Sequence, residues 1–304
     1  MIKALLVNMA RLNYCRTIWN KLSSRYSDKE CYDAFVATMN AQAKKWGMIN
    51  TKWINPSGLG EDGVYSKSTA NDLAIMALHV FHMQGIKYHG QEGCEIVVKK
   101  PYIIPWHRFK KKIIYSTTRI EAIGNGFPII GSKTGSGDGY QTLVMVCDIE
   151  GVKVAGAIMN AEDEQGRFEA MDELMRIAYE ILHRHAENKS KSVTKARNAS
   201  LCVMEENGSI KHIFAQNADE ESAPMSTTKV MTMMIANRYI NDFDRIEYVI
   251  PCDLRDDNGD VLHVWDKLSI KDMMAAMMLN SSNVAANAIA RIAGIEIFKT
   301  GNKE

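Results

Sequence analysis

Three short polar motifs constrain the fold of this chain more than any other feature. Lys133-Thr134-Gly135 comes first, inside GSKTGSG, Ser226 and Lys229 follow inside MSTTKVMT, and Ser281-Ser282-Asn283 comes last, inside MMLNSSNVAANA. On a helix, a serine three residues before a lysine shares a face with it. If the three motifs form one site, the fold must bring Lys133 within a few ångströms of Ser226.

The pairing of Ser226 with Lys229 suits nucleophilic catalysis. A serine hydroxyl is a weak nucleophile at neutral pH, so acyl transfer needs a nearby base and donors aimed at the developing oxyanion. Burial beside a second cation, such as Lys133, would favour the neutral amine that acts as a base. Each motif alone has a structural alternative: a solvated Ser-Lys pair, a helix cap at Ser281 or Ser282, or a strand end at 133–135.

Length and charge fit a folded enzyme without a charged macromolecular partner. The chain has 304 residues, of which 46% are hydrophobic, enough for one large domain or two small ones. Its 37 basic and 36 acidic residues give a net charge of +1, so we expect no nucleic-acid partner and no anionic membrane surface. The apolar run from Ala4 to Val7 is too short for a signal peptide, and no stretch reaches membrane-spanning length.

The sequence predicts neither a metal site nor a disulfide framework. The six cysteines have no C-x-x-C spacing, and the histidines at 79, 82, 89 and 107 have no metal-binding spacing. The run from Asp256 to Asp260 resembles part of a calcium loop but lacks the closing glutamate, so it predicts a turn.

Hydrophobic periodicity predicts a mixed fold of helices and strands. Period-2 runs of β-branched residues predict strands, Asn207-Gly208 predicts a hairpin turn, and Ser66 or Ser68 is the expected cap of one helix. The expected helices cover 29–47, 66–83, 163–183, 226–240, 268–279 and 282–293, and the expected strands 94–100, 111–118, 140–149 and 151–161, with a hairpin over 200–219.

Read from residue 199 to the end and then from 29 to 183, the chain resembles a D-alanyl-D-alanine carboxypeptidase, a low-molecular-weight penicillin-binding protein. The resemblance includes the three motifs and the flanks NADEESAPMSTTK, FVATMNAQAKKWGMINTKWINPSGL, YSKSTANDLAIMA and GRFEAMDELMRIAYEIL. K-T-G comes last in that superfamily, which also holds the serine β-lactamases, so the resemblance implies a circular permutation. It implies an α/β (α+β) fold of the β-lactamase/transpeptidase type, with an antiparallel five-stranded sheet flanked by helices and a helical subdomain.

The permuted order predicts four parts. Residues 29–183 carry the C-terminal part of the transpeptidase-like fold with K-T-G, 184–198 form a linker, and 199–304 carry the N-terminal part with S-x-x-K and S-x-N. The linker can span about 50 Å when extended. Residues 1–28 form an N-terminal helical extension, either an ordinary surface helix or a decayed duplicate of the S-x-N helix. If a duplicate occupied the site, Ser226 and Ser281 would come from a neighbouring chain in a swapped homodimer.

The resemblance implies roles for the catalytic residues. Ser226 attacks the carbonyl of the penultimate D-alanine, Lys229 is the base, and Ser281 passes a proton between Lys229 and the leaving amine. The implied activity is that of a serine-type D-Ala-D-Ala carboxypeptidase working through an acyl-enzyme, without metal or cofactor.

The resemblance also implies the substrate-binding residues. Asn283 holds the substrate amide, and Lys133 and Thr134 bind the terminal carboxylate. Gly135 leaves the strand edge open for substrate. The backbone amide of Ser136 forms the oxyanion hole together with that of the nucleophile.

The implied substrate is a peptidoglycan peptide ending in D-Ala-D-Ala, and β-lactams are the implied covalent inhibitors. By resemblance the protein works outside the cytoplasm in the cell envelope, although no signal peptide is visible. A class A β-lactamase is one alternative, but INPSGLGEDGVYS lacks the expected E-x-x-L-N loop. A catalytically silent module that binds peptidoglycan peptides or a partner is the other alternative.

Overall fold

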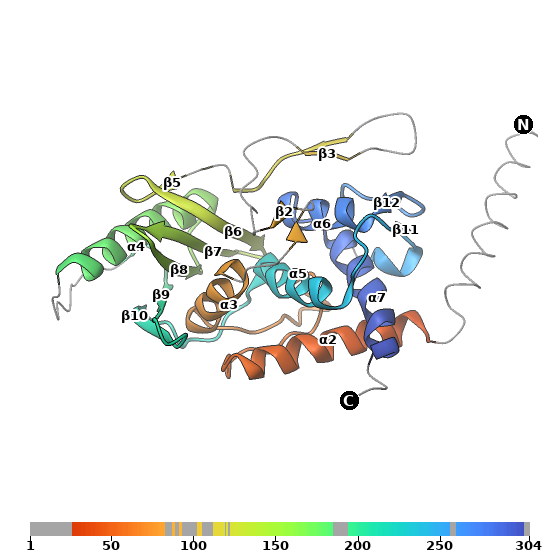
Figure 1. The fold of residues 1–304 in the computed structure, drawn as a ribbon, viewed down its shortest axis with the longest axis horizontal. Helices are drawn as coiled ribbons and strands as arrows, with labels where there is room; N and C mark the ends of the chain where they lie inside the picture. Colours follow the sequence, from red (N-terminus) through yellow and green to blue (C-terminus); the bar gives the residue numbers. More distant parts are fainter. Residues whose placement is uncertain are drawn as a thin grey trace, which may run out of the picture.

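An antiparallel sheet forms the centre of the fold (Figure 1). The computed structural model describes residues 26–82, 87–88, 91–92, 102–104, 112–118, 120, 122–184, 194–255 and 260–300. The sheet consists of β5 (Ala122–Ile123), β6 (Phe127–Gly137), β7 (Tyr140–Ile149), β8 (Val152–Met159), β9 (Asn198–Met204) and β10 (Ile210–Gln216). Their order across the sheet is β10-β9-β8-β7-β6-β5.

The sheet has six described strands, so the expected count of five is wrong. The additional strand is β5, which pairs only with Phe127 and Pro128. A two-residue strand carries no readable alternation, which is why periodicity did not predict it. Beyond this short pairing, the outer edge of β6 borders no other described strand.

Three two-stranded antiparallel pairs account for the other described strands. The pairs are β1 (Lys87–Tyr88) with β2 (Gln91–Glu92), β3 (Tyr102–Ile104) with β4 (Lys112–Ile114), and β11 (Ile246–Tyr248) with β12 (Lys267–Ser269). The expected strand over 94–100 lies outside the described residues. The expected hairpin around Asn207-Gly208 is present as β9 and β10, and Gly208 has the positive φ of 82° that such a turn favours.

The expected helices are all present. They are α2 (Asp28–Lys45), α3 (Ala70–His82), α4 (Glu164–Arg184), α5 (Thr228–Tyr239), α6 (Ile270–Leu279) and α7 (Asn283–Thr300), with 3-10 turns η1 (Met225–Thr227) and η2 (Pro251–Asp253). The cap of α3 is Thr69, whose Oγ1 accepts a hydrogen bond from the Asp72 amide at 3.1 Å, and is neither Ser66 nor Ser68. None of the described helices is long and apolar enough to cross a bilayer.

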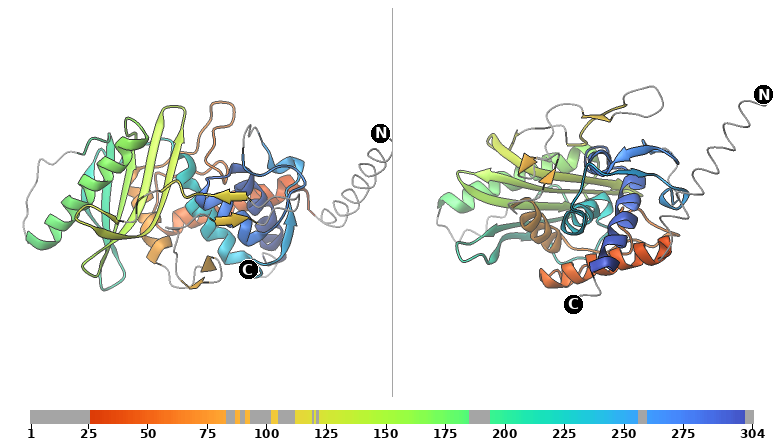
Figure 2. Two further views of the ribbon diagram at one scale, coloured as in Figure 1. Left: turned by 90° about the horizontal axis from the view of Figure 1, so that it is seen from above. Right: turned by 45° about the vertical axis from the view of Figure 1, so that its right-hand side comes forward.

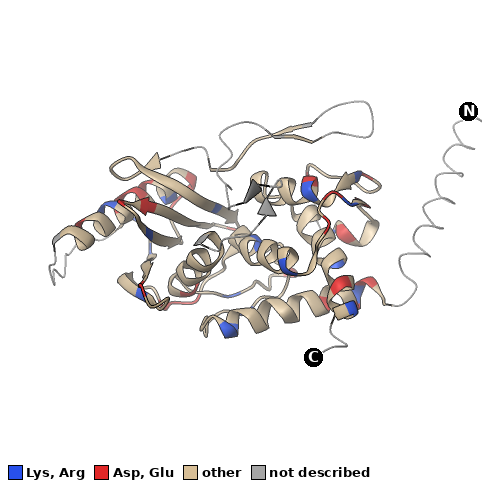
Figure 3. Ribbon diagram, viewed as in Figure 1, with Lys and Arg blue, Asp and Glu red and all other residues tan. Residues whose placement is uncertain are grey.

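Both faces of the sheet are covered. Leu143 and Met145 of β7 point into the core shared with α4, whereas Val144 and Val146 point into the core shared with α3 and the remaining helices. Helices α5, α6 and α7 gather beside one end of the sheet (Figure 2), which gives the expected helical subdomain. Acidic and basic residues are interspersed over the described elements (Figure 3).

The two predicted halves of the chain share this one sheet. Strand β8 belongs to the part expected over 29–183 and pairs directly with β9 of the part expected over 199–304. Residues 185–193 of the expected linker lie outside the described residues, as do residues 1–25 of the expected extension or duplicate.

Helices α2 and α7 pack at close range although they lie at opposite ends of the described chain. A Cβ atom added at Gly294 would lie 2.1 Å from the carbonyl oxygen of Cys31. Next to this contact the rings of Tyr26 and Phe298 stack with their centroids 4.2 Å apart. The end of α7 therefore lies beside the start of α2.

We expect Gly294→Ala to destabilise the fold. The added methyl group forces α2 and α7 apart, and overpacking of this kind costs about 1–3 kcal/mol. The matched control is Gly166→Ala in α4, where the nearest atom to an added Cβ is the side-chain Oδ1 of Asp163 at 3.3 Å. The control should keep or raise the free energy of unfolding in urea, because alanine favours a helix. Equal stability of the two variants would contradict the close packing at Gly294.

Candidate active site

Ser226 lies in a strained turn at the start of α5. Met225, directly before it, is buried and has a φ of 50°, a left-handed conformation that non-glycine residues seldom adopt. Lys229 lies on the same face, and its Nζ is 2.7 Å from Ser226 Oγ. The Lys229 side chain is completely buried, whereas Ser226 is partly exposed.

The S-x-N motif occupies the turn between α6 and α7. Ser281 has a φ of 60°, and its Oγ accepts a hydrogen bond from Lys133 Nζ at 3.0 Å. Asn283 Oδ1 accepts one from Lys229 Nζ at 2.6 Å. A single chain therefore brings the three motifs together.

Lys133 lies beneath the site. It is only 1% exposed, and its Nζ also donates to the Thr134 carbonyl oxygen at 2.8 Å. Burial and then the positive charges of Lys229 and Arg167 hold the pKa of the Lys133 ammonium well below its usual value. The neutral amine is thereby favoured, in the manner expected of two lysines that share a dry site.

Gly135 allows the serine turn to pack against β6. An added Cβ would lie 2.3 Å from Thr142 Oγ1 and 3.0 Å from both the Met225 Cβ and the Pro224 carbonyl oxygen. The absence of a side chain thus lets η1 approach the strand. The expected role of Gly135, an edge kept clear for substrate, is a separate one and stays a prediction.

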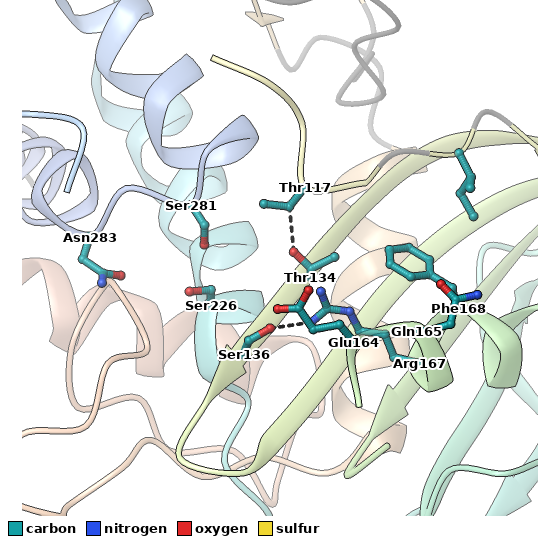
Figure 4. Close-up of a pocket in the computed structure, with 11 residues that line it drawn as sticks. Thr117, Thr134, Ser136, Glu164, Gln165, Arg167, Phe168, Ser226, Ser281 and Asn283 are labelled. Atoms are coloured by element: carbon teal, nitrogen blue, oxygen red, sulfur yellow. Dashed lines mark hydrogen bonds between the residues drawn. The ribbon is translucent and has the colours of Figure 1, made fainter. Parts of the chain in front are cut away.

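A cleft of about 730 Å³ opens above these residues (Figure 4). It runs from Ser226 along β6 toward the first turns of α4. Its lining residues are Thr117, Ile120, Thr134, Ser136, Glu164, Gln165, Arg167, Phe168, Ser226, Ser281 and Asn283. In the described part of the chain, no group of three or more His, Cys, Asp or Glu side chains is placed to hold a metal ion.

Arg167 is a cleft residue that the sequence analysis missed. Its Nη1 donates to Ser136 Oγ at 2.6 Å and to Gln141 Oε1 at 3.0 Å, and its buried Nε finds no hydrogen-bond partner among the described residues. Burial lowers the pKa of this guanidinium, while the negative charge of Glu164 opposes the shift. The only signal in the sequence was a basic residue on the apolar face of the helix over 163–183, and no motif marks it.

Asp260 supports the S-x-N turn from outside the cleft. Ser282 is the N-cap of α7, since its Oγ accepts from the Ala285 amide at 2.9 Å. The Asp260 carboxylate accepts from Ser282 Oγ at 2.7 Å and from the Val284 amide at 3.1 Å. Residues 256–259 of the run that resembled a calcium loop lie outside the described residues, and Asp260 itself caps a helix.

We expect the stability of the fold to rise with pH because of Lys133. Between its lowered pKa and the ordinary value of about 10.4, the unfolded state binds the proton that the folded state lacks. In urea titrations over this range, Lys133→Met should flatten the rise by up to about 1.4 kcal/mol per pH unit. Lys211→Met, at an exposed position of β10, should keep the wild-type slope. An unchanged slope in Lys133→Met would contradict the proton loss.

We expect Asp260→Ala to destabilise α7. The change removes an acceptor and a negative charge from the helix N-terminus, and losing a capping contact costs about 1 kcal/mol. Asp260→Asn keeps an acceptor oxygen and should recover about half of this loss in urea unfolding. If the alanine variant is as stable as wild type, Asp260 does not hold the turn.

The sequence matches a family of cell-wall peptidases. The sequence model of the D-alanyl-D-alanine carboxypeptidase family matches residues 30–163 and 186–296. A D-alanyl-D-alanine endopeptidase from Escherichia coli (strain K12) is 30% identical over 98 residues, 32% of this chain and 31% of that protein. The D-alanyl-D-alanine carboxypeptidase DacF from Bacillus subtilis (strain 168) is 44% identical over 54 residues, 18% of this chain and 13% of that protein. No solved structure matches the chain.

These alignments span less than a third of each relative's own length. The family match is broader, because it covers both the part with K-T-G and the part with the two serine motifs. The chain belongs to the D-alanyl-D-alanine carboxypeptidase family.

Proposed function

We propose that the protein is a serine-type D-Ala-D-Ala carboxypeptidase that acts on peptidoglycan peptides in the cell envelope. The observation that carries the proposal is the 2.7 Å contact between Lys229 Nζ and Ser226 Oγ at the end of an open cleft. Family membership supports the substrate class, as do the names of the two relatives.

In the first step, the Ser226 hydroxyl proton passes to neutral Lys229 while Ser226 Oγ bonds to the carbonyl carbon of the penultimate D-alanine. The resulting oxyanion is stabilised by the backbone amides of Ser226 and Ser136. Substrate lies along the free edge of β6, as an added strand does. Asn283 holds the substrate amide. Its Oδ1 accepts a hydrogen bond from Lys229, and its amide nitrogen donates to a carbonyl oxygen of the substrate.

In the second step, the peptide bond breaks and the leaving nitrogen takes a proton. Ser281 delivers this proton, which the Lys229 ammonium replaces, and Lys133 orients the Ser281 hydroxyl by its hydrogen bond of 3.0 Å. D-alanine departs and leaves an ester on Ser226. A water molecule then hydrolyses the ester and restores the enzyme.

We assign the terminal carboxylate to Thr134 and Arg167. Lys133 was the expected partner, but its ammonium is buried and does not line the cleft. Thr134 Oγ1 lines the cleft and donates to Thr117 Oγ1 at 2.7 Å, and Arg167 lines the same wall. In this assignment Lys133 acts on the substrate through Ser281, and the positive charge that faces the carboxylate is that of Arg167.

A circular permutation accounts for the order of the motifs. In an unpermuted chain, α7 would run directly into α2, and the end of α7 lies beside the start of α2 at the stacked rings of Tyr26 and Phe298. The direct pairing of β8 with β9 also fits, since it joins the two rearranged parts in one sheet.

We expect a fluorescent penicillin to label the wild-type protein covalently at one site. Ser226→Ala should not label, and Ser209→Ala, in the exposed β9–β10 turn, should label like wild type. The label should persist, because the loop that activates a deacylating water in class A β-lactamases is missing. Lys229→Ala should slow D-alanine release from a D-Ala-D-Ala peptide by about 10²- to 10⁴-fold.

The same experiment separates the alternatives. If the wild-type protein stays unlabelled but still binds the peptide, the supported alternative is the catalytically silent binding module. Rapid loss of the label with turnover of penicillin would favour a β-lactamase-like hydrolase. The contacts of Ser226, Lys229 and Asn283 within one chain support a site that needs no second chain, and gel filtration tests whether a swapped homodimer forms.

A further inference from the structure

The loop over 55–59 (NPSGL) is closed around the side chain of its first residue. Asn55 is 1% exposed, its Oδ1 accepts from the Gly58 amide at 2.7 Å, and its Nδ2 donates to the Leu59 carbonyl oxygen at 2.6 Å. A buried amide with both groups engaged fixes the loop in one conformation. The sequence analysis used this segment only as evidence against a class A β-lactamase, because it lacks the E-x-x-L-N motif.

The closed loop docks on the turn that carries the serine. Gly58 has a φ of 79°, and an added Cβ would lie 1.9 Å from the Met225 carbonyl oxygen and 2.8 Å from Thr228 Oγ1. Thr232 Oγ1 of α5 donates to the Pro56 carbonyl oxygen at 2.6 Å. The loop is thus held against the S-x-x-K segment on either side of Ser57.

Docking places the Ser57 carbonyl oxygen 2.8 Å from Lys229 Nζ. Asn283 Oδ1 lies 2.6 Å from the same nitrogen. A carbonyl oxygen accepts hydrogen bonds but cannot donate them, so each of the two fixes one N–H of the neutral amine. The lone pair of the amine is then directed at Ser226 Oγ, which lies 2.7 Å from the same nitrogen.

We propose that the loop over 55–59 is a positioning element for the acyl-transfer base, and that its Ser57 carbonyl aims the lone pair of Lys229 at Ser226. Gly58 is the residue that permits this contact, because any side chain there would push the loop off the serine turn. The inference rests on the proposed function of Ser226 and Lys229 and adds a determinant of their reactivity.

The test compares Gly58→Ala with Gly63→Ala. Both glycines have a similar positive φ, 79° and 76°, so alanine brings the same backbone strain, but an added Cβ at Gly63 has no atom within 4 Å. Rapid-quench labelling with a fluorescent penicillin gives the limiting acylation rate constant and the dissociation constant of the noncovalent complex. Gly58→Ala should lower the rate constant by about 100-fold and leave the dissociation constant unchanged. Gly63→Ala should match wild type.

A second pair of variants applies if Gly58→Ala does not fold. Asn55→Ala frees the loop and should lower the same rate constant, whereas Asn55→Asp keeps an acceptor for the Gly58 amide and should recover part of it. Folded loop variants that acylate like wild type, or that lose only noncovalent affinity, would overturn the inference while the wild type still labels. A wild type that does not label would overturn the proposed function, and the inference with it.

Discussion

The burial of the Lys229 amine is the constraint on which the rest of the site depends. A charged amine without partners in a protein interior costs several kcal/mol, so a buried lysine needs oxygen neighbours or must lose its proton. Here its neighbours include Ser226 Oγ, Asn283 Oδ1 and the Ser57 carbonyl oxygen, which belong to three separate segments of the chain. Satisfying one nitrogen therefore fixes the relative positions of the serine turn, the start of α7 and the loop over 55–59.

A second buried amine lowers the stability of the fold below the ordinary lysine pKa. Lys133 lies below the cleft with its pKa lowered by burial, by Lys229 and by Arg167. Because the folded state binds the Lys133 proton less well than the unfolded state does, the free energy of unfolding falls as the pH drops below the ordinary lysine pKa. The same arrangement favours the neutral amine of Lys133 and places the Arg167 guanidinium in a cleft proposed to bind a carboxylate. The backbone is also strained at Met225 and Ser281, which both have a positive φ. Such a conformation lowers stability and persists only where the surrounding contacts hold it in place.

The order of the motifs along the chain matters little to this arrangement. Strand pairing between β8 and β9, and helix packing of α2 on α7 at Gly294, depend on surfaces that meet in space. Neither contact requires a particular covalent connection nearby, so both contacts are compatible with the proposed circular permutation.

The sequence by itself determined the helices, several of the strands and the motif residues. Helical spacing, the Asn207-Gly208 turn and the three motifs were local signals, so they predicted the helices, the hairpin and the residues that meet at Ser226. The sequence did not predict β5, which is too short for periodicity, or Thr69, which competes with neighbouring serines as a cap. Only the tertiary structure revealed Arg167 in the cleft, the close packing of Gly135 against the serine turn and the contact of the Ser57 carbonyl with Lys229, because each depends on contacts between residues far apart in the chain. A backbone carbonyl has no sequence signature, so its use as a partner for Lys229 follows from packing alone.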